Sequence, residues 1–222
     1  MKNDQLCLII TGGMTSPAFL KKVYQEYRPE MVIAVDSGLN NADAANLPVT
    51  HLIGDFDSVN QEILAEYETR ASKGELSIRR LIPEKDLTDT QSAIEEAIFL
   101  GATEILITGA TGSRLDHVLA NINLLMIPLR NGVKACILDT NNKIYLTRKT
   151  IEIVKSKMHG KYLSLLPLTN EVTGVTLIGM KYPLTNHTLL QGESLGVSNE
   201  LVDEKAEIQL KEGTLIVIES HD

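Results

Sequence analysis

Short apolar runs alternate with amphipathic helical patterns over about the first 130 residues, and this alternation limits the possible folds more than any other feature. Strands are expected at residues 5–13, 31–38, 50–55, 76–81 and 104–112. Helices are expected at residues 16–27, 40–47, 60–71, 88–102 and 114–129. Such an alternation folds through right-handed crossovers into a mostly parallel sheet. Because that sheet is covered on both faces, it also explains runs as apolar as CLII and MVIAV.

After about residue 147 the helical patterns stop, and short β-rich runs separated by Gly, Pro and Asn follow one another. Their spacing, about ten residues, is typical of a small β-sandwich or barrel. The predicted fold class is therefore α/β, with an N-terminal Rossmann-like, mostly parallel sheet, flanking helices and a C-terminal all-β sandwich. We divide the chain into residues 1–147 and 148–222. Residues 134–148 resemble two strands around an Asn-Asn turn and could belong to either part.

Charge and composition exclude several classes of protein. The formal net charge of the 222 residues is −8, whereas a protein that binds a phosphate backbone normally has a basic face. The chain contains no apolar run of about 18 residues, and its first ten residues are interpreted as a strand rather than a signal peptide. Cys7 and Cys136 are expected to be core thiols. We therefore predict a cytoplasmic protein that binds neither nucleic acid nor a membrane.

Polar residues collect in the segments that follow the predicted strands. In an open parallel sheet these segments meet at one edge, where ligands bind. Asp55 and Asp57 in LIGDFDSV place two like charges at the end of a buried strand, which suggests a bound cation. The other residues of this edge are Gly12, Gly13, Asp36, Ser37, Asn40, Lys85, Asp86, Thr88, Asp89, Thr111, Gly112, Ser113, Arg114, Asp116 and His117. Carboxylates beside basic side chains and glycine backbone suit a phosphorylated ligand with a divalent metal ion.

Several of these residues also have a structural interpretation. Asp86 or Thr88 could cap the helix that follows, because Asp and Thr are favoured at that position. Asp36 could form a turn at the end of its strand. Asp55 and Asp57 could form a doubled Asx turn. These alternatives stay open at the level of the sequence.

Arg114 and Asp116 could form only a surface ion pair, and His117 could be structural.

Known nucleotide-binding motifs do not show how a nucleotide would bind to this chain. The P-loop pattern, the three-glycine dinucleotide fingerprint, zinc-ligand spacings and the Gly-x-Ser-x-Gly elbow are all missing from the sequence. A nucleotide would have to be held in another way.

Five segments, taken in order, resemble the thiamine pyrophosphokinase family. They are VDSGLN (35–40), IGDFDS (53–58), EKDLTDTQSAI (84–94), TGATGSRLDHVLANI (108–122) and GMKYPLTNHTLLQGESLGVSNE (179–200). The resemblance covers about residues 9–218. It implies ATP-dependent transfer of an intact pyrophosphoryl group to the hydroxyl of thiamine, which gives thiamine diphosphate and AMP. It also implies Mg²⁺, ATP as co-substrate and a homodimer with sites between subunits.

Five residues are predicted to be catalytic, from the resemblance and from the chemistry of the transfer: Asp55, Asp57, Asp86, Asp89 and Arg114. Asp55, Asp57 and Asp89 are the implied metal ligands, and Asp86 belongs to the same Lys-Asp-x-Thr-Asp motif as Asp89. Arg114 is the best candidate for stabilising charge on the triphosphate, because its planar guanidinium matches phosphate oxygens. Asp57 could instead orient or deprotonate the substrate hydroxyl. The chemistry asks mainly for positioning and charge stabilisation.

The remaining implied contacts concern ATP and thiamine. The expected ATP-binding residues are Gly13, Asp36, Ser37, Asn40, Thr88, Thr111, Gly112, Ser113, Arg114, Asp116 and His117. Ser198 and Asn199 match the family's Ser-Asn pair near thiamine. Ser37 and Ser113 stand where the family often has glycine, which places the local backbone geometry in question. The chain has no tryptophan, so an aromatic ring that stacks on thiamine must be Tyr or Phe, and Tyr182 is the candidate.

Two other functions are compatible with the acidic edge. One is a pyrophosphokinase for another heterocyclic alcohol, such as a hydroxymethylpterin, with different contacts around Ser198 and Asn199. The other is a non-catalytic sensor of a nucleotide or thiamine. A pure binder has no need of so many carboxylates around a triphosphate, so the aspartates favour catalysis.

Overall fold

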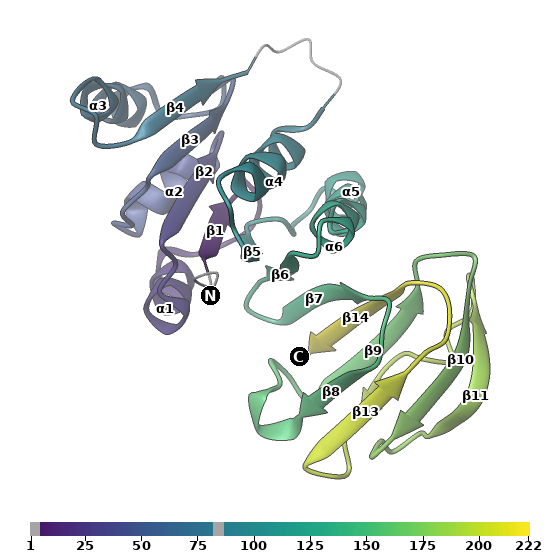
Figure 1. Cartoon of the computed structure of the whole chain (residues 1–222). Helices are drawn as coiled ribbons and strands as arrows, with labels where there is room; N and C mark the ends of the chain where they lie inside the picture. The colour runs from purple at the N-terminus through teal and green to yellow at the C-terminus, as the bar shows by residue number, and fades with distance from the viewer. Residues whose placement is uncertain (1–4, 82–86) are drawn as a thin grey trace. The chain divides into compact units, whose positions relative to one another are not determined.

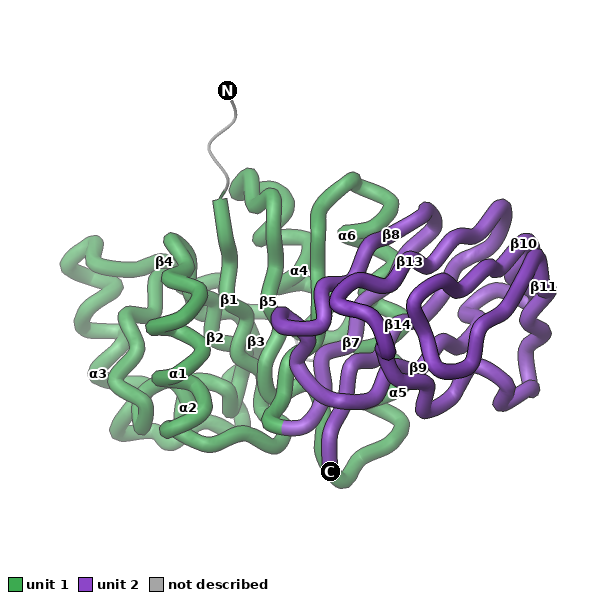
Figure 2. The backbone as a smooth tube through the Cα atoms, turned by 90° about the horizontal axis from the view of Figure 1, so that it is seen from below, with its two compact units in different colours: residues 1–140 green, residues 141–222 purple. Residues whose placement is uncertain are grey.

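The computed structural model describes residues 5–81 and 87–222, and the chain divides after Thr140 into two compact units (Figure 2). The division lies before the predicted boundary at residue 147. The reason is that strand β7 (Asn142–Thr147) pairs antiparallel with β14 (Leu215–Ser220) of the second unit. Strand β6 (Lys134–Leu138) pairs instead with β5 of the first unit. The segment whose membership the sequence left open is thus split between the units.

Within the described residues, the first unit contains a six-stranded parallel sheet in the order β6-β5-β1-β2-β3-β4. Besides β6, its strands are β1 (Leu6–Ile10), β2 (Met31–Val35), β3 (His51–Gly54), β4 (Ser77–Arg80) and β5 (Glu104–Thr108). The order of the strands reverses at β1, which has β2 on one side and β5 on the other. Such a reversal opens a crevice at the carboxyl ends of the strands. The predicted mostly parallel sheet is confirmed.

Helices cover both faces of this sheet (Figure 1). They are α1 (Pro17–Tyr27), α2 (Gly38–Ala44), α3 (Gln61–Ser72), α4 (Asp89–Phe99), α5 (Leu115–Leu124) and α6 (Met126–Arg130). Right-handed crossovers place α1 to α3 on one face and α4 to α6 on the other. In the part of the chain that the structure describes, no helix is both long and apolar enough to cross a membrane.

The helix predicted over residues 114–129 is divided at Leu125, which ends α5 and begins α6. Pro128 explains the break, because proline lacks an N–H and its ring clashes with the carbonyl four residues earlier, at Leu124. The core of this unit is formed by the central strands β1 and β2, whose apolar side chains are buried except for the partly buried Leu6. Cys7 and Cys136 are buried, as predicted, and burial raises the pKa of the Cys7 thiol to about 12.

The second unit is an antiparallel β-sandwich, which confirms the predicted C-terminal fold. One sheet has the order β12-β9-β14-β7 and the other β11-β10-β13-β8. The strands not yet given are β8 (Ile151–Val154), β9 (Tyr162–Pro167), β10 (Glu171–Ile178), β11 (Leu184–Leu190), β12 (Asn199–Glu200) and β13 (Lys205–Gln209). A short 3-10 turn, η1 (Lys155–Lys157), follows β8. Alternate residues of both sheets, such as Leu163, Val175 and Val217, form one core between them.

Candidate active site

A cavity of about 640 Å³ lies at the carboxyl ends of β1, β2 and β5 in the first unit. Its walls include the loops after β1 and β5, the start of α4 and one face of α5. Eleven residues predicted from the sequence line it: Gly12, Gly13, Asp36, Ser37, Thr88, Asp89, Thr111, Gly112, Ser113, Arg114 and His117. Asn40, Asp55, Asp57 and Asp116 do not line it. Asp86 lies outside the described residues.

The loops after β1 and β5 approach each other closely at Gly13. The Gly13 N–H donates to the carbonyl oxygen of Gly109 at 2.7 Å, and the Met14 N–H donates to that of Thr111 at 2.8 Å. A Cβ atom on Gly13 would lie 2.2 Å from the Gly109 oxygen and 2.5 Å from the Thr111 oxygen. Only glycine therefore permits this approach, which closes one side of the cavity.

Asp36 is the most perturbed acidic group of the site. Its Oδ1 accepts the Phe56 N–H at 3.2 Å, and its carboxyl group shares a hydrogen bond with Asp89. Burial raises the pKa of Asp36 to about 7, and the hydrogen bond and negative charge of Asp89, with the charge of Asp55, add to the rise. Gly54 makes room for this carboxyl group, since a Cβ there would lie 1.8 Å from Asp36 Oδ1.

The backbone conformation of Phe56 sets the directions of its two neighbours, Asp55 and Asp57. Its side chain is buried, and its backbone has a left-handed φ of 67°, which is costly for an aromatic residue. The Asp57 N–H donates to Asp55 Oδ1 at 3.1 Å, so Asp55 forms one Asx turn. Asp57 itself is exposed. Asp55 thus contributes negative charge near Asp36, whereas Asp57 faces solvent.

A metal ion at this edge would have oxygen ligands only. Among the described residues, no three His, Cys, Asp or Glu side chains converge into a complete metal site. The chemistry of the donors nevertheless fits Mg²⁺, which is commonly held by one or two carboxylates together with waters and substrate phosphates. The pKa of Asp36 is raised first by burial and then by its neighbours Asp89 and Asp55, whose negative charges a bound cation would offset.

Arg114 and Asp116 form the predicted surface ion pair. Arg114 Nη2 lies 2.6 Å from Asp116 Oδ2, and Nε lies 3.3 Å from Oδ1. The hydrogen bond from Arg114 lowers the pKa of Asp116 to about 2. Both side chains are largely exposed, so the pair contributes little to stability. Arg114 also lines the cavity and precedes α5, where its side chain makes no capping bond. The first-turn N–H groups of α5 are therefore not capped by Arg114.

Two predicted ATP-binding residues have structural partners. Thr88 caps α4, because its side chain accepts the Gln91 N–H at 3.2 Å. Asn40 Oδ1 accepts the Asn60 N–H at 3.0 Å, and its Nδ2 donates to the Ser58 carbonyl oxygen at 3.5 Å. The structural interpretation of Thr88 is thus confirmed. Asn40 ties α2 to the segment before α3 and does not reach the cavity wall.

Asn121 lines the cavity and was not predicted as a site residue. It is only 7% exposed, and its Nδ2 donates to the Ala110 carbonyl oxygen at 2.9 Å. Its Oδ1 accepts no hydrogen bond from any residue that the structure describes. Met14 and Val118 provide apolar surface in the same cavity. Helical spacing could have identified Asn121, which lies three residues after Val118 and four after His117, on one face of α5.

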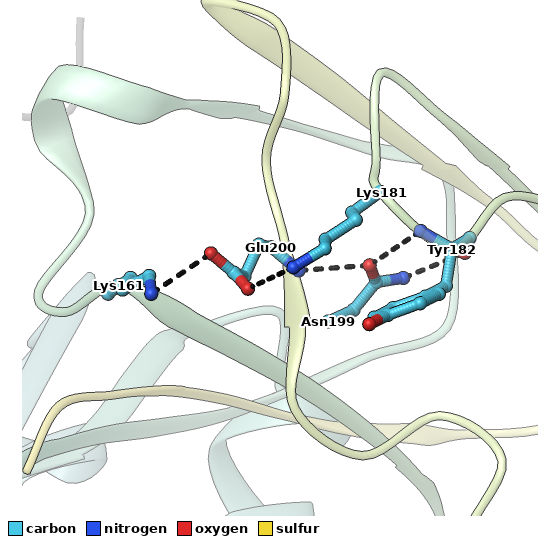
Figure 3. Close-up of polar contacts among 5 residues, drawn as sticks. All are labelled: Lys161, Lys181, Tyr182, Asn199 and Glu200. Carbon is cyan, nitrogen blue, oxygen red and sulfur yellow. Dashed lines mark hydrogen bonds and ion pairs between the residues drawn. The ribbon is translucent and has the colours of Figure 1, made fainter.

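In the second unit, the predicted Ser-Asn pair has two different environments. Ser198 is exposed and has a left-handed φ of 58°, with its N–H bonded to Ser164 Oγ at 3.0 Å. Asn199 is buried, and its side-chain amide is bonded to the backbone of Tyr182 (Figure 3). The Tyr182 side chain is exposed.

Two family models match the chain. The model described as thiamin pyrophosphokinase, catalytic domain, matches residues 25–137. The model described as thiamin pyrophosphokinase, vitamin B1 binding domain, matches residues 148–215. The first contains most of the cavity residues, and the second contains Tyr182, Ser198 and Asn199.

Named relatives and solved structures agree with these matches. The thiamine pyrophosphokinase of Bacillus subtilis (strain 168) is 32% identical over 191 residues, which cover 86% of this chain and 87% of the relative. A crystal structure of thiamine pyrophosphokinase from Bacillus subtilis matches with a TM-score of 0.84 and 29% identity, covering 98% of this chain and 100% of that chain. A thiamin pyrophosphokinase family protein from Enterococcus faecalis gives 0.78 at 32% identity, covering 98% and 99%.

Proposed function

The chain belongs to the thiamine pyrophosphokinase family, and on that premise we propose how its own residues carry out the reaction. The enzyme transfers a pyrophosphoryl group from ATP to the hydroxyl of thiamine, and the products are thiamine diphosphate and AMP. The membership does not favour a pterin pyrophosphokinase or a non-catalytic sensor.

ATP binds in the cavity of the first unit. The observation that carries this proposal is the composition of its walls, which combine an acidic part with an apolar part. Asp36 and Asp89 follow β2 and begin α4, whereas Met14 comes from the loop after β1 and Val118 comes from α5 with the amide of Asn121 near it. The triphosphate with its metal ion suits the acidic part, and the adenosine suits the apolar part.

The aspartates hold Mg²⁺ and position the thiamine hydroxyl. Asp55 and Asp89 are the preferred metal ligands, with Asp36 beside them, and Mg²⁺ when bound neutralises charge on phosphate oxygens. Asp57 is a further candidate ligand. Because its carboxylate is exposed, whereas the charge of Asp55 acts on Asp36, we prefer Asp57 as the group that orients the hydroxyl or accepts its proton.

Arg114 stabilises the polyphosphate during transfer. Its guanidinium is exposed, and among the described residues it is bonded only to the similarly exposed carboxylate of Asp116. Phosphate oxygens can therefore replace Asp116 at low cost. The start of α5 favours negative charge at the same place. These groups stabilise the charge that develops on the leaving AMP and on the transferred group.

Thiamine binds to the second unit, with the ring of Tyr182 as the stacking surface and the Ser198 hydroxyl as a polar contact. Both side chains are exposed, and in the described part of the chain the Ser198 hydroxyl makes no hydrogen bond. The resemblance further implies a homodimer with sites between subunits. We also propose a cytoplasmic location.

A product assay tests the reaction. The protein is incubated with ATP, Mg²⁺ and thiamine, and AMP is separated from ADP by chromatography. We expect AMP and thiamine diphosphate in equal amounts and only when thiamine is present. ADP as the product would contradict pyrophosphoryl transfer. A hydroxymethylpterin tested in place of thiamine should give no AMP.

A further inference from the structure

We propose that Asn199 is a positioning residue, which fixes Tyr182 and makes no contact with thiamine. The proposal rests on the thiamine site proposed above for the second unit. The two residues of the Ser-Asn pair then have different roles, because Ser198 contacts thiamine and Asn199 does not.

The side-chain amide of Asn199 has no hydrogen-bonding capacity left for a ligand. Its Oδ1 accepts the N–H groups of Tyr182 at 3.0 Å and of Glu200 at 2.9 Å. Its Nδ2 donates to the Tyr182 carbonyl oxygen at 2.8 Å and to Met180 Sδ at 3.6 Å. A primary amide offers two acceptor and two donor positions, so all four are used. The residue is also 4% exposed, which leaves little surface for a substrate.

The amide of Asn199 acts as an additional backbone pair between two segments. Met180 and Leu201 form an antiparallel bridge, and the Lys181 N–H donates to the Glu200 carbonyl oxygen at 2.9 Å. At Tyr182, the Asn199 side chain takes over the role of a peptide group, binding both the N–H and the carbonyl oxygen. The Asn199 amide therefore fixes the backbone from which the Tyr182 ring projects.

The charged groups around Asn199 and Tyr182 contribute little to fixing the Tyr182 backbone. Glu200 is bonded to Lys181 at 2.9 Å and to Lys161 at 3.2 Å (Figure 3). The lysine side chains are about half to two-thirds exposed, and exposed ion pairs contribute little. Replacing Lys161 should therefore leave thiamine binding almost unchanged, and Lys161→Ala is a suitable control variant.

The ring of Tyr182 stays accessible although its backbone is fixed. It is 57% exposed and lies on the same turn as the Lys181 ammonium group, 5.6 Å from the ring centroid. An aromatic ring on a fixed backbone loses less conformational entropy when a flat heterocycle stacks on it. Asn199 thus improves thiamine affinity through Tyr182.

The Asn199→Asp variant separates positioning from direct contact. Aspartate keeps the acceptor oxygen that binds the two N–H groups, but an oxygen replaces the NH2 group and cannot donate to the Tyr182 carbonyl oxygen. Positioning therefore requires Asn199→Asp to be as harmful as Asn199→Ala. We expect each to raise the KM for thiamine by about tenfold, as for loss of about 1.4 kcal/mol. The KM for ATP should not change. If Asn199 touched thiamine directly, a carboxylate near that cation would preserve or lower its KM.

A double-mutant cycle with Tyr182→Ala gives a second test. If Asn199 acts through Tyr182, then Asn199→Ala should have no further effect on the KM for thiamine once the ring is removed. Ser198→Ala should remain additive with Tyr182→Ala. Additive effects of Asn199→Ala and Tyr182→Ala would overturn the proposal.

Amide hydrogen exchange gives a readout that does not depend on activity. The Tyr182 N–H should be protected in the wild-type protein and should exchange at least about tenfold faster in Asn199→Ala. Unchanged protection in that variant would overturn the proposal. If the wild-type protein formed no AMP with thiamine, the proposed function would fail, whereas exchange at Tyr182 would still decide whether Asn199 holds that residue.

Discussion

Replacing Gly13 by alanine should damage both the stability of the first unit and its affinity for ATP. The added Cβ would lie 2.2 Å and 2.5 Å from two backbone carbonyl oxygens, whereas contacts under 3.0 Å are essentially never seen. The loops after β1 and β5 would have to separate by roughly 1 Å, which weakens the two hydrogen bonds between them, at about 1 kcal/mol each. With overpacking, the expected loss of unfolding free energy is about 2–4 kcal/mol.

The neighbouring Gly12→Ala variant is a matched control. There the Cβ would lie 2.0 Å from Ser37 Oγ, which is a side-chain oxygen that can turn away by rotation about χ1. The nearest backbone atom is the Gly38 nitrogen at 3.7 Å. Neither Gly12 nor Gly13 has a positive φ, so alanine is compatible with both backbone conformations. The expected loss of unfolding free energy for Gly12→Ala is below about 1 kcal/mol.

Urea unfolding measures the free energy of unfolding of each variant relative to the wild-type protein, from the shift in the unfolding midpoint at constant m value. The KM for ATP, from AMP formation, should rise in Gly13→Ala. Gly12→Ala is the control for stability alone, because it displaces the side chain of Ser37, which also lines the cavity. If both variants had the same free energy of unfolding within about 0.5 kcal/mol, the close approach of the two loops would not determine stability. If the KM for ATP were also unchanged, that approach would not shape the ATP site.

Three further predictions concern the same cavity. Asp55→Asn should lower kcat by at least about 100-fold with a much weaker Mg²⁺ dependence, and full activity would contradict a metal role. Asp36→Asn should stabilise the EDTA-treated protein at pH 8, because the wild-type carboxyl group, whose pKa is raised to about 7, must ionise there at a cost. This stabilisation should be about 1–2 kcal/mol after discounting for solvent exposure. It should vanish near pH 4, because below that pH the Asp36 carboxyl group is protonated in both the folded and the unfolded protein. Thermal unfolding of both proteins between pH 4 and pH 8 measures this dependence. Asn121→Leu should raise the KM for ATP and leave that for thiamine unchanged, as measured by AMP formation.

The sequence by itself determined the order of elements and the chemistry of the site edge. Buried strands and amphipathic helices differ in periodicity, which neighbouring residues along the chain display directly. Thr88 was predicted as a possible cap from its type and place, and it is one. Pro128 was visible in the sequence but was included in a continuous helix, although it cannot sit in a helix interior.

Only the tertiary structure decided which of the polar side chains line the cavity and which bond to other parts of the chain. Asn40 and Asn199 were both expected to bind substrates, and in the structure one is bonded to Asn60 and the other to Tyr182. Asn121 lines the cavity without having been predicted. The direction of a side chain depends on partners that are distant in sequence, and an amide binds a backbone group as readily as a ligand. Residue type and spacing therefore locate the site edge, whereas long-range hydrogen bonds decide which of its groups remain free.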